Sequence, residues 1–460
     1  MAKKKKQKRS NAQLVLLALI AFTVIAWLGL LNNKTTQTNE RADLLSAADE
    51  FEANEIYKMA AQKLERYLEL EPKSYDTMLR LAEDYFLFGD TNGFIGSCDR
   101  AISIDKTREE PYALKADYYI EQAQYAEAIK VLDAAERVVT NNPKLKAIRD
   151  SLHGKYVEKY LSATELGEWI DNGKNSYLTV GSDEKWGLVL QDGKSKIRQK
   201  FGFLGAYSEA DLGEGIAEGI LPCEVDGEWY YIDLDGDKRL IGKEAYEYLG
   251  AFCDEYAPAQ RAGTWGYITP KFEEKSFIYT YAGAFSEGVA AVKKGEMWAL
   301  LDSKLKEITS FEFDDISIDA NGFCARYGLV VVRRGTKSYL YDTKAKTISE
   351  KGFDELRMPA SEDGAIAAKT GDFWGFIDRS GKEILAPEFE DADSFSMGFA
   401  PVQVQERWGY IDASGAMVIE AKFFEARSFT SKGVAAVKSN SYGWNLIVLC
   451  EYDIATGGLF

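Results

Sequence analysis

The chain has 460 residues, 46% of them hydrophobic and 28% charged, which is enough apolar material for two or three folded domains. Its formal net charge is −17, although residues 1–9 alone carry six positive charges. This acidity argues against a nucleic-acid partner, because phosphates require a basic surface. A single histidine, His153, argues against most histidine-based catalysis and metal binding.

The N-terminal region places the basic tail, residues 1–9, before an uncharged apolar run from Leu14 to Leu31. A helix of these 18 residues would span about 27 Å, close to the hydrocarbon thickness of a membrane. No small-residue cleavage site or lipobox cysteine follows it, which favours an uncleaved signal anchor over residues 10–31. The positive-inside rule then predicts a single-pass protein of the cytoplasmic (inner) membrane. Residues 1–9 would lie in the cytosol, and the bulk of the chain, after a linker at 32–40, in the periplasm or outside the cell.

Residues 41–162 show helical spacing of apolar positions and an internal period of 34 residues. Small residues at one phase would let two helices approach closely, and an aromatic three residues later would fill the same face. The repeated residues are Ala48, Ala82 and Ala116, followed by Phe51, Tyr85 and Tyr119, and then by Ala60, Phe94 and Ala128. This all-α stack of helical hairpins resembles the tetratricopeptide repeat family over about 120 residues. Phe94 and the glycine-rich stretch 89–93 depart from the family pattern.

A last helix, from Lys144 to Leu161, is predicted to cap this stack, since a terminal repeat needs a polar outer face. His153 falls on it and has no acidic or thiol neighbour at metal-ligand spacing, so it is interpreted as a surface or junction residue.

From residue 163 to 460 the pattern changes to the alternating apolar residues of half-buried strands. A tryptophan strand recurs about every 35 residues in eight units, the fifth of which is degenerate. Within a unit, that strand leads through a turn such as Ser380-Gly381 into a short second strand, and a third strand returns to the next tryptophan. Each unit is therefore predicted to be a three-stranded meander that must stack on its neighbours.

The units beginning at Trp374 and Trp408 carry the pattern W-G-[YF]-I-D and closely resemble the WG-repeat family. The resemblance implies an all-β repeat module, frequent in bacterial envelope proteins and without a general catalytic site. Eight units could close into a propeller-like ring or remain an open spiral. The tryptophans are interpreted as core anchors between units. They are Trp186, Trp229, Trp265, Trp298, Trp374, Trp408 and Trp444.

No motif indicates a metal, a cofactor or a catalytic site. Asp233, Asp235, Asp237 and Glu244 fall at calcium-loop spacing, but Lys238 stands where such a loop needs glycine, and a hairpin turn explains the stretch. The five cysteines form no C-x-x-C pair and are expected to be buried thiols, while a bridge between Cys223 and Cys253 stays open.

The leading hypothesis is a non-enzymatic, membrane-anchored bacterial envelope scaffold that binds other proteins through its repeats. Asp49, Glu83 and Asp117 each follow a repeated alanine, so they are candidate groove residues for a basic partner segment. The alternative is a glycan or cell-wall binder that stacks sugars on exposed aromatics of the β units, for which Tyr246, Tyr248, Tyr279 and Tyr281 are candidates. The partner's identity and the oligomeric state stay open.

Overall fold

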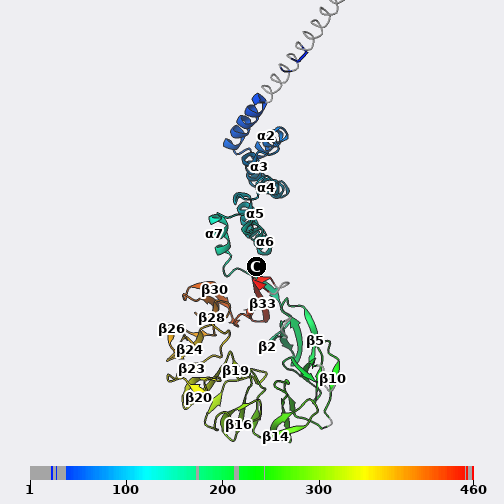
Figure 1. The fold of residues 1–460 in the computed structure, drawn as a ribbon, viewed down its shortest axis with the longest axis vertical. Helices are drawn as coiled ribbons and strands as arrows, with labels where there is room; N and C mark the ends of the chain where they lie inside the picture. Colours follow the sequence, from blue (N-terminus) through cyan, green and yellow to red (C-terminus); the bar gives the residue numbers. More distant parts are fainter. Residues whose placement is uncertain are drawn as a thin grey trace, which may run out of the picture. The chain divides into compact units, whose positions relative to one another are not determined.

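The computed structural model describes residues 22–23, 27, 38–171, 176–211, 217–242, 244–450, 452–453 and 458–459. The chain divides into two compact units, Met1–Leu152 and His153–Phe460, a helical unit and a β unit (Figure 1). None of the helices in these described ranges is long and apolar enough to cross a membrane. Apart from Phe22, Thr23 and Trp27, the predicted span lies outside them. The predicted membrane-spanning helix and inner-membrane localisation are thus contradicted and are not carried further.

The helical unit consists of consecutive antiparallel helices. Residues 38–53 are helical, and the helices that follow are α2 (Tyr57–Leu70), α3 (Tyr75–Phe88), α4 (Thr91–Ile104), α5 (Glu110–Glu121), α6 (Tyr125–Glu136) and α7 (Pro143–Ser151). The repeated alanines at 48, 82 and 116 are all fully buried, as the 34-residue period requires.

The glycine-rich stretch has a steric explanation. Gly89 ends α3 in the left-handed conformation with φ 85°. A Cβ atom on Gly93 would stand 2.5 Å from the Tyr85 ring. Gly93 therefore makes room for the large Tyr85 side chain in the middle hairpin.

The predicted last helix, Lys144 to Leu161, is wrong in its second half. Helix α7 ends at Ser151, and Tyr156–Tyr160 forms strand β1 of the β unit. His153 stacks on the Phe399 ring with a centroid separation of 4.8 Å. The capping helix ends early because the residues predicted for its second half form a strand. That strand pairs in a sheet whose other strands lie almost 300 residues further along the chain.

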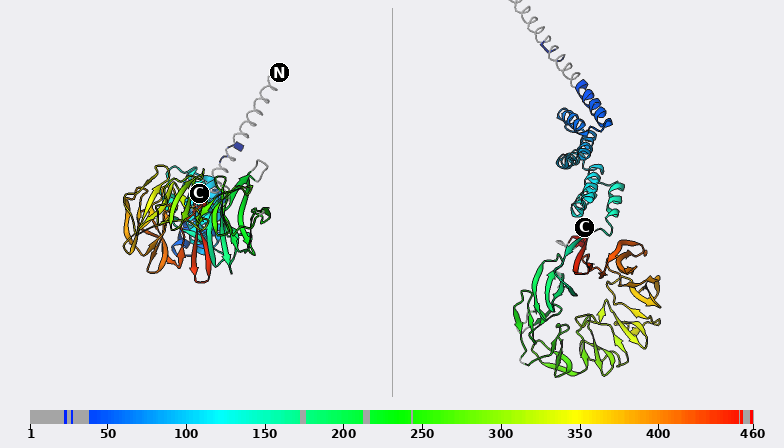
Figure 2. Two further views of the ribbon diagram at one scale, coloured as in Figure 1. Left: turned by 90° about the horizontal axis from the view of Figure 1, so that it is seen from below. Right: turned by 180° about the vertical axis from the view of Figure 1, so that it is seen from behind.

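The β unit is an eight-bladed propeller (Figures 1 and 2). Its blades, written from the innermost strand outward, are as follows. Blade 1 is β2 (Glu165–Asp171), β3 (Ser176–Ser182), β4 (Lys185–Leu190) and β5 (Ser195–Phe201); blade 2 is β6 (Phe203–Leu204), β8 (Ala217–Val225), β9 (Glu228–Ile232) and β10 (Lys238–Leu240), with β7 (Ser208–Asp211) beside β8. Blade 3 is β11 (Tyr248–Leu249), β12 (Ala257–Arg261), β13 (Thr264–Ile268) and β14 (Glu274–Tyr279); blade 4 is β15 (Tyr281–Ala282), β16 (Val289–Lys294) and β17 (Met297–Asp302).

The second half of the propeller repeats this arrangement. Blade 5 is β18 (Asp315–Ile316), β20 (Leu329–Arg334), β21 (Lys337–Asp342) and β22 (Thr347–Ile348), with β19 (Ala325–Arg326) beside β20; blade 6 is β23 (Glu355–Leu356), β24 (Ile366–Thr370), β25 (Phe373–Ile377) and β26 (Glu383–Phe389). Blade 7 is β27 (Asp391–Ala392), β28 (Phe399–Val404), β29 (Arg407–Asp412) and β30 (Met417–Phe423); blade 8 is β31 (Glu425–Ala426), β32 (Val434–Asn440), β33 (Gly443–Leu449) and β1. A terminal hairpin pairs β34 (Tyr452–Asp453) with β35 (Gly458–Leu459).

Two observations decide between the ring and the open spiral in favour of the ring. Strand β1 pairs antiparallel with β33, so the start of the unit completes its last blade. A buried cluster also joins Leu178 and Val180 of blade 1 to Val434 and Trp444 of blade 8. The pairing of β1 with β33 ties the start of the unit to its last blade and so closes the ring.

The prediction of three-stranded units is corrected to four strands in most blades. It missed the innermost strands of blades 2–8, which are two residues long. Such strands are too short to show a period-two pattern in the sequence.

The glycine of the W-G pattern is a packing requirement. A Cβ atom on Gly409 would lie 2.5 Å from the carbonyl oxygen of Ile419 on the neighbouring outer strand, and the same clash arises at Gly187 and Gly375. Each site coincides with an irregular register between the tryptophan strand and the outer strand. Glycine lets the outer strand fold inward over the tryptophan strand.

Candidate functional site

The hub of the propeller is lined by two positions in each blade, one at the start of the innermost strand and one two residues later. The first hub position is the first residue of that strand, and it is Glu165, Phe203, Tyr248, Tyr281, Asp315, Glu355, Asp391 and Glu425 in blades 1 to 8. The second hub position lies two residues later on the same face, and it is Gly167, Gly205, Gly250, Gly283, Ser317, Arg357, Asp393 and Arg427. Blades 2–4 thus present aromatic residues and glycine, whereas blades 5–8 present charged residues and serine.

In blades 2–4 the aromatic residues fill the hub. Rings from the first hub position alternate with tryptophans in one continuous series, here called the aromatic arc. It runs Phe203, Trp229, Tyr248, Trp265, Tyr281 and Trp298, with successive centroid distances of 5.1, 5.0, 4.9, 4.9 and 5.3 Å. Glycine at the second hub position leaves the space that these rings occupy.

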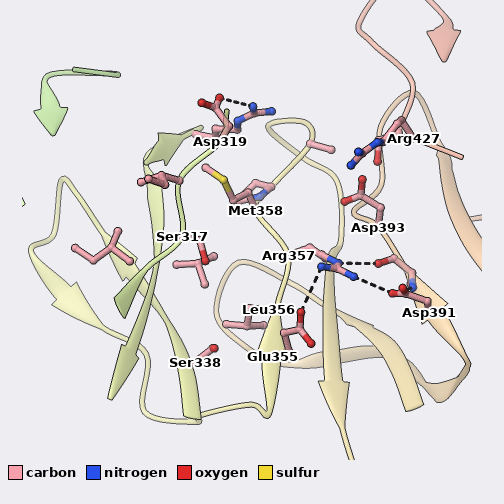
Figure 3. A pocket seen from close by; sticks show the side chains of 18 of the residues that line it. Ser317, Asp319, Ser338, Glu355, Leu356, Arg357, Met358, Asp391, Asp393 and Arg427 are labelled. Atoms are coloured by element: carbon pink, nitrogen blue, oxygen red, sulfur yellow. Dashed lines mark hydrogen bonds and ion pairs between the residues drawn. The ribbon is translucent and has the colours of Figure 1, made fainter. Parts of the chain in front are cut away.

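In blades 5–8 the hub stays open. A cavity of about 1090 Å³ is lined by the innermost strands of these four blades and by residues 166–169 of blade 1. Figure 3 shows Arg357 bridging two blades across its wall. Its guanidinium contacts Asp391 at 3.0 Å, Glu355 at 3.3 Å and the Ala392 carbonyl at 3.3 Å. Through these contacts Arg357 joins blades 6 and 7.

A second ion-pair group crosses the hub. Arg326 of blade 5 contacts Asp319 at 2.8 Å and Glu168 of blade 1 at 3.7 Å. Burial, followed by the negative charge of Asp319, raises the pKa of Glu168. The Glu168 carboxylate is therefore partly desolvated, and Arg326 neutralises its negative charge only in part.

Beside this group, three polar groups keep unused hydrogen-bonding capacity. Arg427 is exposed in the cavity, and its guanidinium makes no ion pair or hydrogen bond to the described residues. In Figure 3 it points toward Asp393, whose carboxylate accepts only the Ser394 backbone N–H, at 2.8 Å. The indole N–H of Trp169 is buried and has no acceptor in the described part of the chain. The lining of one cavity thus contains two donors and one acceptor that keep unused capacity.

The helical unit carries the predicted groove acids, which differ in environment. Asp49 is paired with Arg80 at 2.6 Å, and Arg80 also contacts Glu52 at 2.8 Å. Glu83 and Asp117 keep exposed surface and have no ion pair within 4.0 Å in the described helices. Partial burial raises the pKa of both carboxyl groups, and the charge of Glu52 adds to the effect at Glu83.

Two features of this groove had not been predicted. Asp84 is 3% exposed, its Oδ2 atom has no hydrogen-bond partner among the described residues, and burial raises its pKa to about 7. A pocket of about 230 Å³ lies one helical turn beyond Glu83, between Phe86, Phe94 and Tyr118. Phe86 and Leu87 are 43% and 53% exposed. The solvent-facing aromatic at Phe86, next to the glycine-rich turn, was the available sequence signal.

The remaining predicted residues lie in the propeller. All seven tryptophans pack in buried clusters between neighbouring blades; those at 298, 374 and 444 are buried and the other four are half-buried. Tyr246 and Tyr279 are buried, whereas Tyr248 and Tyr281 belong to the aromatic arc. None of the four thus stands as a free aromatic platform.

The calcium-like stretch is a hairpin turn. The Asp233 carboxylate accepts the N–H groups of Asp235 and Asp237 and pairs with Arg239. The aspartates at 302, 378 and 412 make the same turn in other blades. All five cysteines are free thiols, including those at 223 and 253.

The fold and the two recesses define a repeat-built protein of the kind that serves as an interaction or binding module. Residues 265–298, 374–407 and 408–442 match the family model described as WG containing repeat. The propeller therefore contains WG repeats at these three stretches. No curated protein matches it.

Among solved structures, the first tetratricopeptide repeat domain of Spaghetti (RPAP3), bound to an HSP90 peptide, is 15% identical and covers 25% of this chain and 94% of its own, with a TM-score of 0.22. A eukaryotic initiation factor is 12% identical, covers 62% of this chain and 82% of its own, and has a TM-score of 0.37. Hsv2 of Kluyvelomyces marxianus is 11% identical, covers 47% of this chain and 85% of its own, and has a TM-score of 0.31.

Proposed function

We propose that the protein is a non-catalytic adaptor whose helical unit binds a basic segment of another protein. The observation that carries this proposal is that Glu83 and Asp117 are exposed and have no ion pair within 4.0 Å in the described helices. The carboxyl groups of Glu83, Asp84 and Asp117 all have raised pKa values because they are partly or fully desolvated. A lysine or arginine side chain placed beside them would restore the favourable charge pairing that the folded helices alone do not supply.

The neighbouring apolar pocket adds a second requirement for the partner. Phe86, Phe94 and Tyr118 contact one another at centroid distances between 5.3 and 6.4 Å, yet Phe86 remains 43% exposed. Phe86 and Leu87 lie three and four residues after Glu83, so they share its side of α3. An apolar partner residue one helical turn away from the basic one would cover this surface.

Selection of random 12-residue peptides by phage display on the intact protein tests this function. We expect enrichment of peptides that combine lysine or arginine with an aliphatic or aromatic residue. Their affinity should fall about tenfold or more in a Glu83→Gln, Asp117→Asn double variant, because two charge-assisted contacts are lost.

The control is Glu127→Gln on α6, an exposed acid already paired with Lys130 at 2.8 Å. It should leave binding unchanged, whereas added salt should weaken the binding of all variants that bind. Enrichment of neutral or acidic peptides, or equal binding by the double variant, would contradict the proposal.

A further inference from the structure

The open half of the propeller hub is a polar cavity, although aromatic residues at the same two hub positions could have filled it. Blades 2–4 close their part of the hub with the aromatic arc, using the same two hub positions. Blades 5–8 place charged residues and serine there instead and leave about 1090 Å³ empty of protein. Polar side chains such as Arg427 are exposed in this open hub, so they are accessible to a ligand.

The unused groups indicate which chemistry the cavity accepts. The free Arg427 guanidinium is a donor, and the Asp393 carboxylate beside it is an acceptor. The Trp169 N–H is a further donor without a partner in the described part of the chain, and Trp169 belongs to the same cavity lining. A hydroxyl group donates and accepts a hydrogen bond at the same oxygen. Adjacent hydroxyl groups of one ligand could therefore satisfy all three protein groups together.

The charge balance disfavours a strongly charged ligand. Arg326 is already shared between Asp319 and Glu168, and Arg357 between Glu355 and Asp391. The two unpaired side chains, Arg427 and Asp393, carry opposite charges and lie next to one another, so a ligand with a net charge would be attracted by one and repelled by the other. A neutral ligand rich in hydroxyl groups avoids that repulsion.

The shape of the site disfavours a peptide strand. The innermost strands of blades 5–8 are two residues long, too short to pair with an incoming strand. The volume, on the other hand, lies at the upper end of the roughly 300–1,000 Å³ typical of small-molecule sites. It suits several linked sugar rings better than one.

We propose that this cavity binds a neutral oligosaccharide, with Arg427, Asp393 and Trp169 as its hydrogen-bonding residues. This binding is separate from the peptide binding proposed for the helical unit, and each can fail without the other.

The test is a glycan array probed with the intact protein, followed by calorimetry with the best neutral tetrasaccharide. We expect saturable binding, weakened about ten- to hundredfold by Arg427→Met and by Asp393→Asn, because each loses hydrogen bonds to a charged group. Trp169→Phe keeps an aromatic side chain but removes the N–H donor together with part of the indole ring, so it should weaken binding about three- to tenfold.

The matched control is Arg198→Met, which removes an exposed guanidinium from the outer strand β5, away from the cavity. It should bind like the unchanged protein, and circular dichroism should show all four variants folded. The proposal is overturned if no neutral glycan binds, if the three hub variants bind as tightly as the control, or if only charged glycans or peptides compete for the cavity.

Discussion

The buried carboxyl group of Asp84 should make the helical unit less stable as the pH rises. Its pKa is raised from 3.8 to about 7, mainly by burial and then by the charge of Glu52. A folded state with the higher pKa binds the proton more tightly than the unfolded state, so the protonated form favours folding. That stabilisation is complete below the unfolded value of 3.8 and is lost as the pH rises through about 7.

The size of the effect follows from the two pKa values. Between pH 5.5 and pH 8 the folded Asp84 loses most of its proton, while the unfolded residue is ionised throughout. At 1.36 kcal/mol per pKa unit, this single group lowers the free energy of unfolding by about 2 kcal/mol over that interval. Asp84→Asn has no proton to lose, so its stability should exceed that of the unchanged protein by a margin that grows with pH.

Hydrogen exchange of the intact protein, resolved for peptides from α2 to α5 and corrected for the intrinsic pH dependence, measures this difference. The control is Asp99→Asn, which changes an exposed carboxylate on α4 that pairs with Lys115. It should not reproduce the growing margin. Parallel pH dependences for Asp84→Asn and the unchanged protein would refute the assignment of the raised pKa to Asp84.

Substitutions at three further positions test the account of the fold. Glu158→Ala removes the carboxylate that accepts hydrogen bonds from Ser439 and Asn445 at the ring closure. It should therefore lower the free energy of unfolding of the propeller by about 1–2 kcal/mol, measured by urea unfolding, and Glu158→Gln should lower it by less. Gly409→Ala forces a Cβ atom against backbone and should cost about 2–4 kcal/mol in the same assay; a smaller loss than from an exposed-site alanine change would contradict the packing account. Gly96→Ala on α4 meets nothing within 4 Å and should stabilise the helical unit by up to about 1 kcal/mol, which thermal unfolding at 222 nm can measure.

The hub shows why the candidate sites were only partly predictable. Glu168 and Arg326 are 158 positions apart in the sequence, and they meet only because eight blades bring blade 1 and blade 5 to a common centre. Neither residue belongs to a local motif. Glu83 and Asp117 could be singled out because each directly follows a buried alanine of the 34-residue period, and their role in binding stays a prediction. Asp84, by contrast, is an ordinary polar residue in the sequence, and only the packing of the helices makes it unusual.

The sequence by itself determined the two kinds of repeat, their periods and the residues that pack between them. Positions that are buried once in every repeat carry the same kind of residue, so the sequence shows them directly. Ala82 in the helices and Trp374 in the propeller are examples. Only the tertiary structure decided that the ring closes through β1 and that half of the hub stays open. Both depend on contacts between residues far apart in the sequence, and such contacts leave no periodic signal along the chain. The innermost strands that build the hub are two residues long, which is too short to show an alternating pattern.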